Sequence, residues 1–295
     1  MGFSFALCHD PKIEAVMLKG LARKLVRRLA GDQPEFREAD ALLKAADLPA
    51  EAVRRLLPSY LASNSWQVRN VAIKLIERLQ DPALYPVLVQ TVHKGTDAGI
   101  VVRNAVAIIR RLGLKTPDVE LALQRALAAQ YWEVRCEAIR SLAELFEYTP
   151  TRSELIIRAL QPRTTIRGGY YFMETNFEVR AAAAMALGGF GRPETALPVL
   201  EGLAADPHWM VRCQAAVAIT ELSRRYPEIV PRAGKALDAI DPLSDGCRSD
   251  FPFPQTVAAL RKAVDNGLAK MEPAAIRGMY IDMQHGWNRK RQEKA

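Results

Sequence analysis

Apolar residues recur at helical spacing along most of the chain, and short polar turns separate the amphipathic segments that they define. A proline stands at or next to the start of the first helix in each pair, where its missing N–H costs no hydrogen bond. The sequence therefore predicts an all-α chain of about six helix pairs, at 49–62 with 65–79, 82–94 with 98–112, 117–129 with 131–147, 151–161 with 176–190, 193–205 with 208–225, and 227–239 with 255–271.

Further amphipathic segments lie at both ends of the chain. Residues 11–30 have apolar positions at helical spacing up to Gly31, a second helix is expected over 34–47, and a terminal helix over 273–288. Stacked arrays need such ends to shield their last apolar face. We therefore expect N-terminal capping helices over 1–48, a repeat array over 49–271, and a C-terminal helix with a basic tail over 272–295.

The second helices share a short motif, in which a turn is followed by Val-Arg and small apolar residues. Its fullest form is DPHWMVRCQAAVAITEL, from Asp206 to Leu222. The motif places successive arginines 34, 32, 45 and 32 residues apart, at Arg69, Arg103, Arg135, Arg180 and Arg212. Six residues before each arginine stand Ser63, Asp97, Ala129, Glu174 and Asp206, and three before it Trp66, Ile100, Trp132, Phe177 and Trp209. A near-constant period of this length is typical of a solenoid.

The V-R-x-x-A motif, with an aspartate six residues before its arginine, resembles HEAT repeats over residues 49–271. The short period is similar to that of the repeats named for phycobilisome lyases. The resemblance implies a right-handed α-solenoid in which aspartate and arginine form a polar ladder between neighbouring units. We accordingly assign structural roles, with the aromatic residues packing at the turns, to Trp66, Arg69, Arg103, Trp132, Arg135, Arg180, Asp206, Trp209 and Arg212.

The chain has a net charge of +8 and a pI near 9.4, which permits an anionic partner. Much of the excess lies in residues 12–28 and in the tail after residue 288. The positions two and five residues past each arginine are mixed and partly apolar, whereas a surface that tracks phosphates would be mainly basic; they are Val71, Lys74, Ala105, Ile108, Glu137, Arg140, Ala182, Met185, Gln214 and Val217.

The sequence offers no recognisable catalytic or metal-binding motif. Its histidines are isolated, and the repeated His-Glu pairs of the HEAT-repeat hydroxylase are missing. Cys136 and Cys213 follow the Val-Arg pair and are expected to be small buried residues, while the glycines near 190 are expected to cap a helix. We expect no catalytic residue, no metal and no cofactor. The N-terminal segment lacks the basic start of a secretory signal, and the cysteines show no spacing for bridges or ligands. We therefore expect a reducing cytoplasm of the bacterial type.

Two insertions interrupt the period, at 162–175 and 241–254. Both fall between the two helices of a pair, so they are expected on the same edge, where insertions in repeat proteins often bind partners. Their arginines and aromatic residues are typical of interface hot spots. We expect partner binding by Arg163, Arg167, Tyr170, Tyr171, Phe172, Arg248, Phe251 and Phe253.

These features favour a non-enzymatic protein-interaction scaffold, adaptor or assembly chaperone that uses the solenoid groove and both edge loops. A nucleic-acid-binding or HEAT-like DNA glycosylase-type protein is one alternative, since the chain is basic. A bilin lyase-type subunit is a second alternative, because of the repeat type. A membrane-peripheral adaptor that binds through residues 12–28 is a third.

Overall fold

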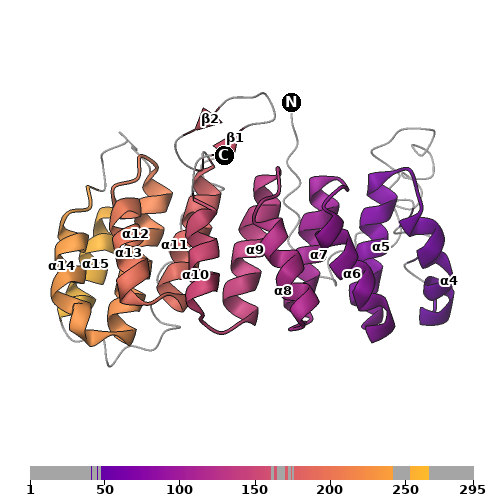
Figure 1. Cartoon of the computed structure of the whole chain (residues 1–295), viewed down its shortest axis with the longest axis horizontal. Helices are drawn as coiled ribbons and strands as arrows, with labels where there is room; N and C mark the ends of the chain where they lie inside the picture. Colours follow the sequence, from indigo (N-terminus) through magenta and orange to yellow (C-terminus); the bar gives the residue numbers. More distant parts are fainter. Residues whose placement is uncertain are drawn as a thin grey trace, which may run out of the picture. The chain divides into compact units, whose positions relative to one another are not determined.

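The computed structural model describes residues 48–160, 176–241 and 253–265, together with residues 41, 45, 163, 164, 170, 171 and 174. Apart from two strands of two residues each, the regular elements of these residues are helices (Figure 1). They are α4 (Ala50–Leu61), α5 (Trp66–Leu79), η2 (Pro82–Leu84), α6 (Tyr85–Lys94), α7 (Gly99–Arg111), α8 (Pro117–Ala126), α9 (Trp132–Leu145), α10 (Pro150–Arg158), β1 (Arg163–Thr164), β2 (Tyr170–Tyr171), α11 (Phe177–Phe190), α12 (Pro193–Ala204), α13 (Trp209–Arg225), η3 (Pro227–Ile229), α14 (Val230–Asp238) and α15 (Phe253–Asp265).

The predicted all-α solenoid architecture of consecutive helix pairs is confirmed. Two first helices open with a 3-10 turn, η2 and η3, which the apolar pattern did not distinguish from α-helix. The second insertion was expected to reach residue 254, but α15 already begins at Phe253. The expected capping segments lie almost entirely outside the described residues.

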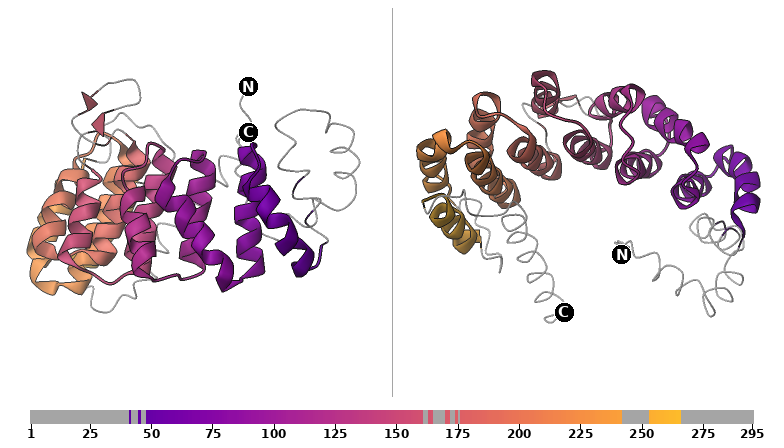
Figure 2. Two further views of the ribbon diagram at one scale, coloured as in Figure 1. Left: turned by 45° about the vertical axis from the view of Figure 1, so that its right-hand side comes forward. Right: turned by 90° about the horizontal axis from the view of Figure 1, so that it is seen from below.

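The helix pairs form two compact units, residues 1–112 and residues 113–295. In the first unit α5 packs against α4 and α7, and α6 packs against α7. In the second unit α9, α11 and α13 pack side by side in that order, and α15 packs against α13. Figure 2 shows the first helix of each pair in one layer and the second helix in another, within each unit. We call these layers the first-helix face and the second-helix face.

Small residues allow the second helices of the second unit to approach closely. The segment Ala181–Ala184 of α11 is buried, and α13 is buried from Val211 to Ser223. A Cβ atom added to Gly188 would lie 2.5 Å from the Cα atom of Ala218 on α13. Gly188 therefore serves helix packing inside α11, which corrects its assignment as a cap; Gly191 is the C-cap residue.

Ion pairs also join neighbouring first helices of the second unit. Arg152 of α10 donates from Nε and Nη2 to Glu120 of α8 at 2.6 and 2.9 Å. Arg232 of α14 makes the same bidentate contact to Glu201 of α12, at 2.7 and 2.6 Å. Hydrogen bonding to Arg152 lowers the pKa of Glu120 although partial burial opposes it. The first-helix face is therefore held by partly exposed charges as well as by apolar packing.

A candidate protein-binding surface

The repeated arginine binds a carbonyl of the preceding turn at α5, α9, α11 and α13. In the second unit Arg180 of α11 donates to both carboxylate oxygens of Asp206, at 2.6 and 2.8 Å, and to the carbonyl of Glu174 at 2.9 Å. Asp206 also accepts from the backbone N–H of His208 at 2.8 Å. Arg180 thus closes the turn of its own repeat through the Glu174 carbonyl and joins that turn to the next repeat through Asp206.

The first unit uses the same arrangement. Arg69 donates to both oxygens of Asp97, at 2.8 and 2.6 Å, and to the carbonyl of Ser63 at 2.6 Å. Burial tends to raise the pKa of Asp97, but hydrogen bonds from Arg69 and from the backbone of Ala98 outweigh it and lower that pKa. The carboxylate consequently stays charged, and the pair remains an ion pair at neutral pH.

A third contact between an arginine and an acid of the next repeat involves a residue of the first insertion. Arg135 of α9 donates to Glu174 Oε1 at 2.7 Å, and both side chains are buried. The backbone N–H of Glu174 donates to the carbonyl of Leu160 at 3.0 Å, which brings the two ends of the insertion together. Two arginines of the motif make different contacts: Arg212 donates to the carbonyls of Asp206 and Pro207, and Arg103 to the side chain of Asn104.

The insertion itself contains an antiparallel β-hairpin, which the sequence did not predict. Arg163 pairs with Tyr171 and Thr164 with Tyr170 in the register of its two strands. The side chains of these residues and of Phe253 lie outside the described residues, as do Arg167, Phe172, Arg248 and Phe251 in full. The predicted convergence of the two insertions therefore stays a prediction.

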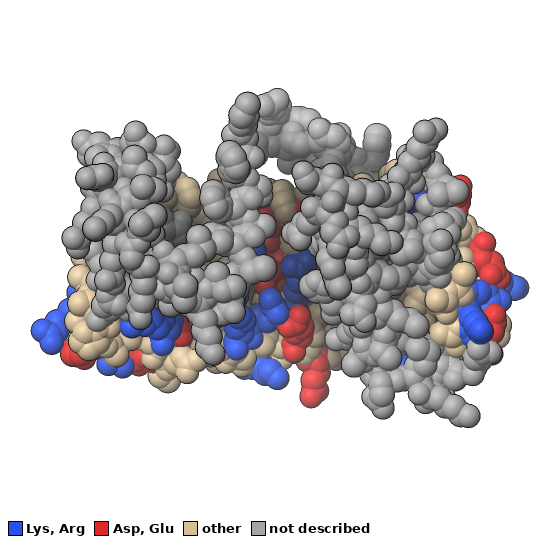
Figure 3. Space-filling view, turned by 180° about the vertical axis from the view of Figure 1, so that it is seen from behind, with Lys and Arg blue, Asp and Glu red and all other residues tan. Residues whose placement is uncertain are grey.

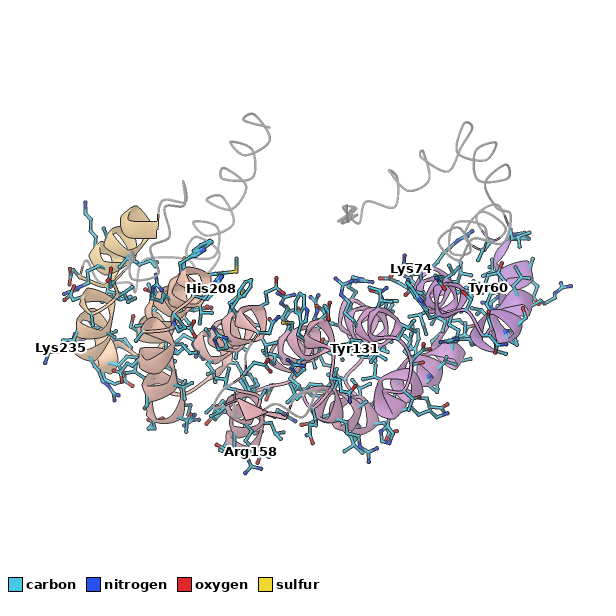
Figure 4. All side chains as sticks on the ribbon, turned by 90° about the horizontal axis from the view of Figure 1, so that it is seen from above. Tyr60, Lys74, Tyr131, Arg158, His208 and Lys235 are labelled. Carbon is cyan, nitrogen blue, oxygen red and sulfur yellow. The ribbon has the colours of Figure 1, made fainter. Side chains whose placement is uncertain are left out.

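Aromatic residues line the same turns. Trp66 is 39% exposed, Trp132 36% and Tyr131 48%, so these rings are only partly used in packing. The Phe177 ring stacks on His208 with centroids 3.8 Å apart. His208 is the N-cap residue of α13, where Nδ1 accepts from the backbone N–H of Met210 at 3.3 Å. In the second unit, Figure 4 shows His208 on the second-helix face and Arg158 and Lys235 on the first-helix face.

The second-helix face between α9 and α11 carries acidic and apolar side chains. Glu133 and Glu178 stand in the first turns of these helices, and burial together with the charge of Glu133 raises the pKa of Glu178. Arg140 lowers that pKa, but its effect is smaller. Met185, two turns along α11 from Glu178, is 43% exposed. Sequence reasoning missed both glutamates, although each lies two residues before a repeated arginine.

Most of the ten positions two and five residues past the repeated arginines are buried. The residues two past each arginine are buried, and Ile108 and Val217 are buried as well. Arg140 and Met185 are exposed, and Lys74 is half-buried. Where grey atoms do not cover this side, Figure 3 shows acidic side chains next to basic ones. The exposed part of the face is thus mixed in charge and partly apolar.

Cys136 and Cys213 are buried free thiols, as predicted, and burial raises the pKa of each to about 12. At pH 8 only about one molecule in ten thousand would carry either thiolate, which is the reactive form. We expect iodoacetamide to leave both cysteines unmodified in the native chain and to alkylate both in denaturant, as read by peptide mass spectrometry. Native labelling as fast as that of a free thiol would contradict the burial of these side chains.

The described residues hold no group of three or more histidine, cysteine or carboxylate side chains arranged to bind a metal ion. None of the helices built from them has both the length and the apolar character needed to cross a bilayer.

The comparison with known families agrees with this repeated architecture. Residues 172–261, which include α11 to α14 and most of α15, match the family model described as HEAT repeats. A search of curated proteins found no match to the chain. Equivalent helix pairs, with the same arginine-to-acid contact, precede the matched segment. The chain is therefore similar to HEAT repeats over residues 172–261.

Proposed function

We propose that the chain is a non-enzymatic protein-interaction scaffold, and that its partner binds the turn edge and the second-helix face of the second unit. The observation that carries this proposal is the exposure of Tyr131 and Trp132 at the start of α9. The Arg135 guanidinium is bound to Glu174 and to the carbonyl of Gln130, whereas the two large rings remain partly in contact with solvent. Tyrosine and tryptophan are enriched among the residues that dominate binding energy at interfaces.

The repeated architecture suits such a role. Stacked helix pairs present an extended and rigid surface, so little conformational entropy is lost when a partner binds. The ladder fixes the turns on which the aromatic side chains stand, because Arg69, Arg135 and Arg180 each tie a turn to the following repeat. HEAT repeats, the family matched here, commonly act as interaction scaffolds. An adaptor or assembly chaperone is the specific form that we favour.

The hairpin would extend the binding surface. Its base is tied to α10 and α9 through Glu174, and the chain enters α11 directly after it. Arg163, Tyr170 and Tyr171 belong to its strands, and arginine and tyrosine are both typical of interface hot spots. Replacing residues 163–171 with a short flexible linker should therefore weaken partner binding without unfolding the helix pairs.

A photocrosslinking amino acid at position 131, introduced in cells of the native host, tests the proposal. We expect a discrete crosslinked protein at this position and none at position 121. Leu121 is a matched control because it is 45% exposed but belongs to α8 on the first-helix face. Equal crosslinking at both positions, or none at position 131, would contradict the proposal.

The double variant Tyr131→Ser/Trp132→Ser should weaken binding of the crosslinked partner by about tenfold or more, since each anchor of this kind contributes 1–2 kcal/mol or more. The variant Leu121→Ser should bind as the parent chain does. Purified partner and isothermal titration calorimetry give both values. Unchanged affinity in the double variant would mean that the aromatic pair is not the contact.

A further inference from the structure

The carboxylates of Glu133 and Glu178 differ from three other buried or half-buried acids of the second unit. Glu120, Glu174 and Asp206 each pair with an arginine of a neighbouring helix or repeat. Glu178 instead interacts with the like charge of Glu133. Its Oε2 atom is buried and accepts no hydrogen bond from the described residues.

This arrangement destabilises the isolated chain. A carboxylate removed from water needs a cation or hydrogen-bond donors to offset its lost hydration, and a second carboxylate nearby increases the cost. Arg140 is the basic residue that acts on Glu178, but its Nη1 donates to Glu137 at 3.4 Å, and about half of its side chain faces solvent. A further cation placed between α9 and α11 would therefore be bound favourably.

Apolar groups flank the two carboxylates. Trp132 directly precedes Glu133, and Met185 stands on the same side of α11 as Glu178, two turns further along. Both side chains are more than a third exposed. A tryptophan ring attracts a lysine or arginine cation over its face, and a methionine side chain adapts its shape to an apolar partner. We call these four residues, Trp132, Glu133, Glu178 and Met185, the α9–α11 face.

We propose that the α9–α11 face binds a basic amphipathic segment of a protein partner, with a lysine or arginine between Glu133 and Glu178 and apolar residues against Trp132 and Met185. This inference rests on the proposed function and names the chemistry of the partner. Apolar contacts at helical spacing combined with opposite charge are the usual terms of helix-in-groove recognition. An acidic segment or a nucleic acid would instead add negative charge beside two carboxylates, so the negative charge of Glu133 and Glu178 disfavours both.

Two synthetic peptides test the inference with the full chain. One is an amphipathic helix of lysine and leucine, and the other has every lysine replaced by glutamate. We expect saturable binding of the lysine peptide in fluorescence anisotropy and none of the glutamate peptide. The double variant Glu133→Gln/Glu178→Gln keeps the side-chain shape but removes the charge, and it should bind the lysine peptide about tenfold more weakly.

A charge-matched control separates this face from the overall charge of the chain. The variant Glu154→Gln/Glu194→Gln removes two exposed acids from α10 and α12 on the first-helix face, and it should bind as the parent chain does. Equal loss in both double variants, binding of the glutamate peptide, or no binding of the lysine peptide would overturn the inference. None of these results would affect crosslinking at position 131, so failure of the inference and failure of the proposed function remain distinguishable.

Discussion

Replacing Asp206 with alanine should lower the free energy of unfolding by about 3–5 kcal/mol, because the buried guanidinium of Arg180 loses its carboxylate. The side chains of Arg180 and Asp206 are only 6% and 1% exposed, and two hydrogen bonds join them. Asp206 also accepts from the N–H of His208, so the turn loses a second contact. Urea unfolding followed by circular dichroism measures the change.

Glu201→Ala is the matched control for this prediction. Arg232 and Glu201 form a bidentate pair of similar length, but their side chains are 53% and 32% exposed. Solvent screens such a pair, so its loss should lower the free energy of unfolding far less than Asp206→Ala does. Asp206→Asn keeps a hydrogen-bond acceptor, so its loss in the free energy of unfolding should lie between those of the two alanine variants. This variant remains measurable if Asp206→Ala fails to fold. Equal losses for Asp206→Ala and Glu201→Ala would show that burial does not set the strength of the ladder.

Gly188→Ala should destabilise the second unit by about 1–3 kcal/mol, the usual cost of overpacking a core. The added methyl group would lie 2.5 Å from the backbone of Ala218, so α11 and α13 would have to separate. The higher helix propensity of alanine offsets only about 1 kcal/mol of this cost. Thermal unfolding would show the change as a lower midpoint.

Gly202→Ala tests the same substitution without the close approach. Gly202 lies in α12, is exposed, and has nothing within 4 Å of an added Cβ atom. Alanine should therefore stabilise the chain by about 0.4–1 kcal/mol, through helix propensity and a less flexible unfolded state. If both alanine variants shifted stability in the same direction, close packing at Gly188 would not be the cause.

Much of the fold could be predicted because the residues that determine each helix pair lie within a single repeat. Prolines such as Pro117 and Pro193 stand at the first position of a helix, and apolar spacing gives the extent of the buried side. The 45-residue step between Arg135 and Arg180 located the first insertion, since every other measured step is close to a constant length. The hairpin inside it was missed because two-residue strands carry no recognisable alternation.

The candidate surface was less predictable than the fold. The sequence pointed to the positions two and five residues past each repeated arginine, but most of those residues are buried. Glu133 and Glu178 are 45 residues apart in the chain, and a sequence does not show that they act on each other. The exposure of Tyr131 could not be predicted from the sequence either, since an aromatic residue beside a turn is usually expected to pack.

The sequence by itself determined the helix pairs, their period and the position of the repeated arginine, because these depend on residues within one repeat. Only the tertiary structure decided which of the arginines pair with an acid of the next repeat, because partners such as Arg180 and Asp206 belong to different repeats. It also decided that Gly188 serves helix packing rather than capping, and that one oxygen of Glu178 is buried without a donor among the described residues. Such features depend on the distance between packed helices, which no local pattern encodes.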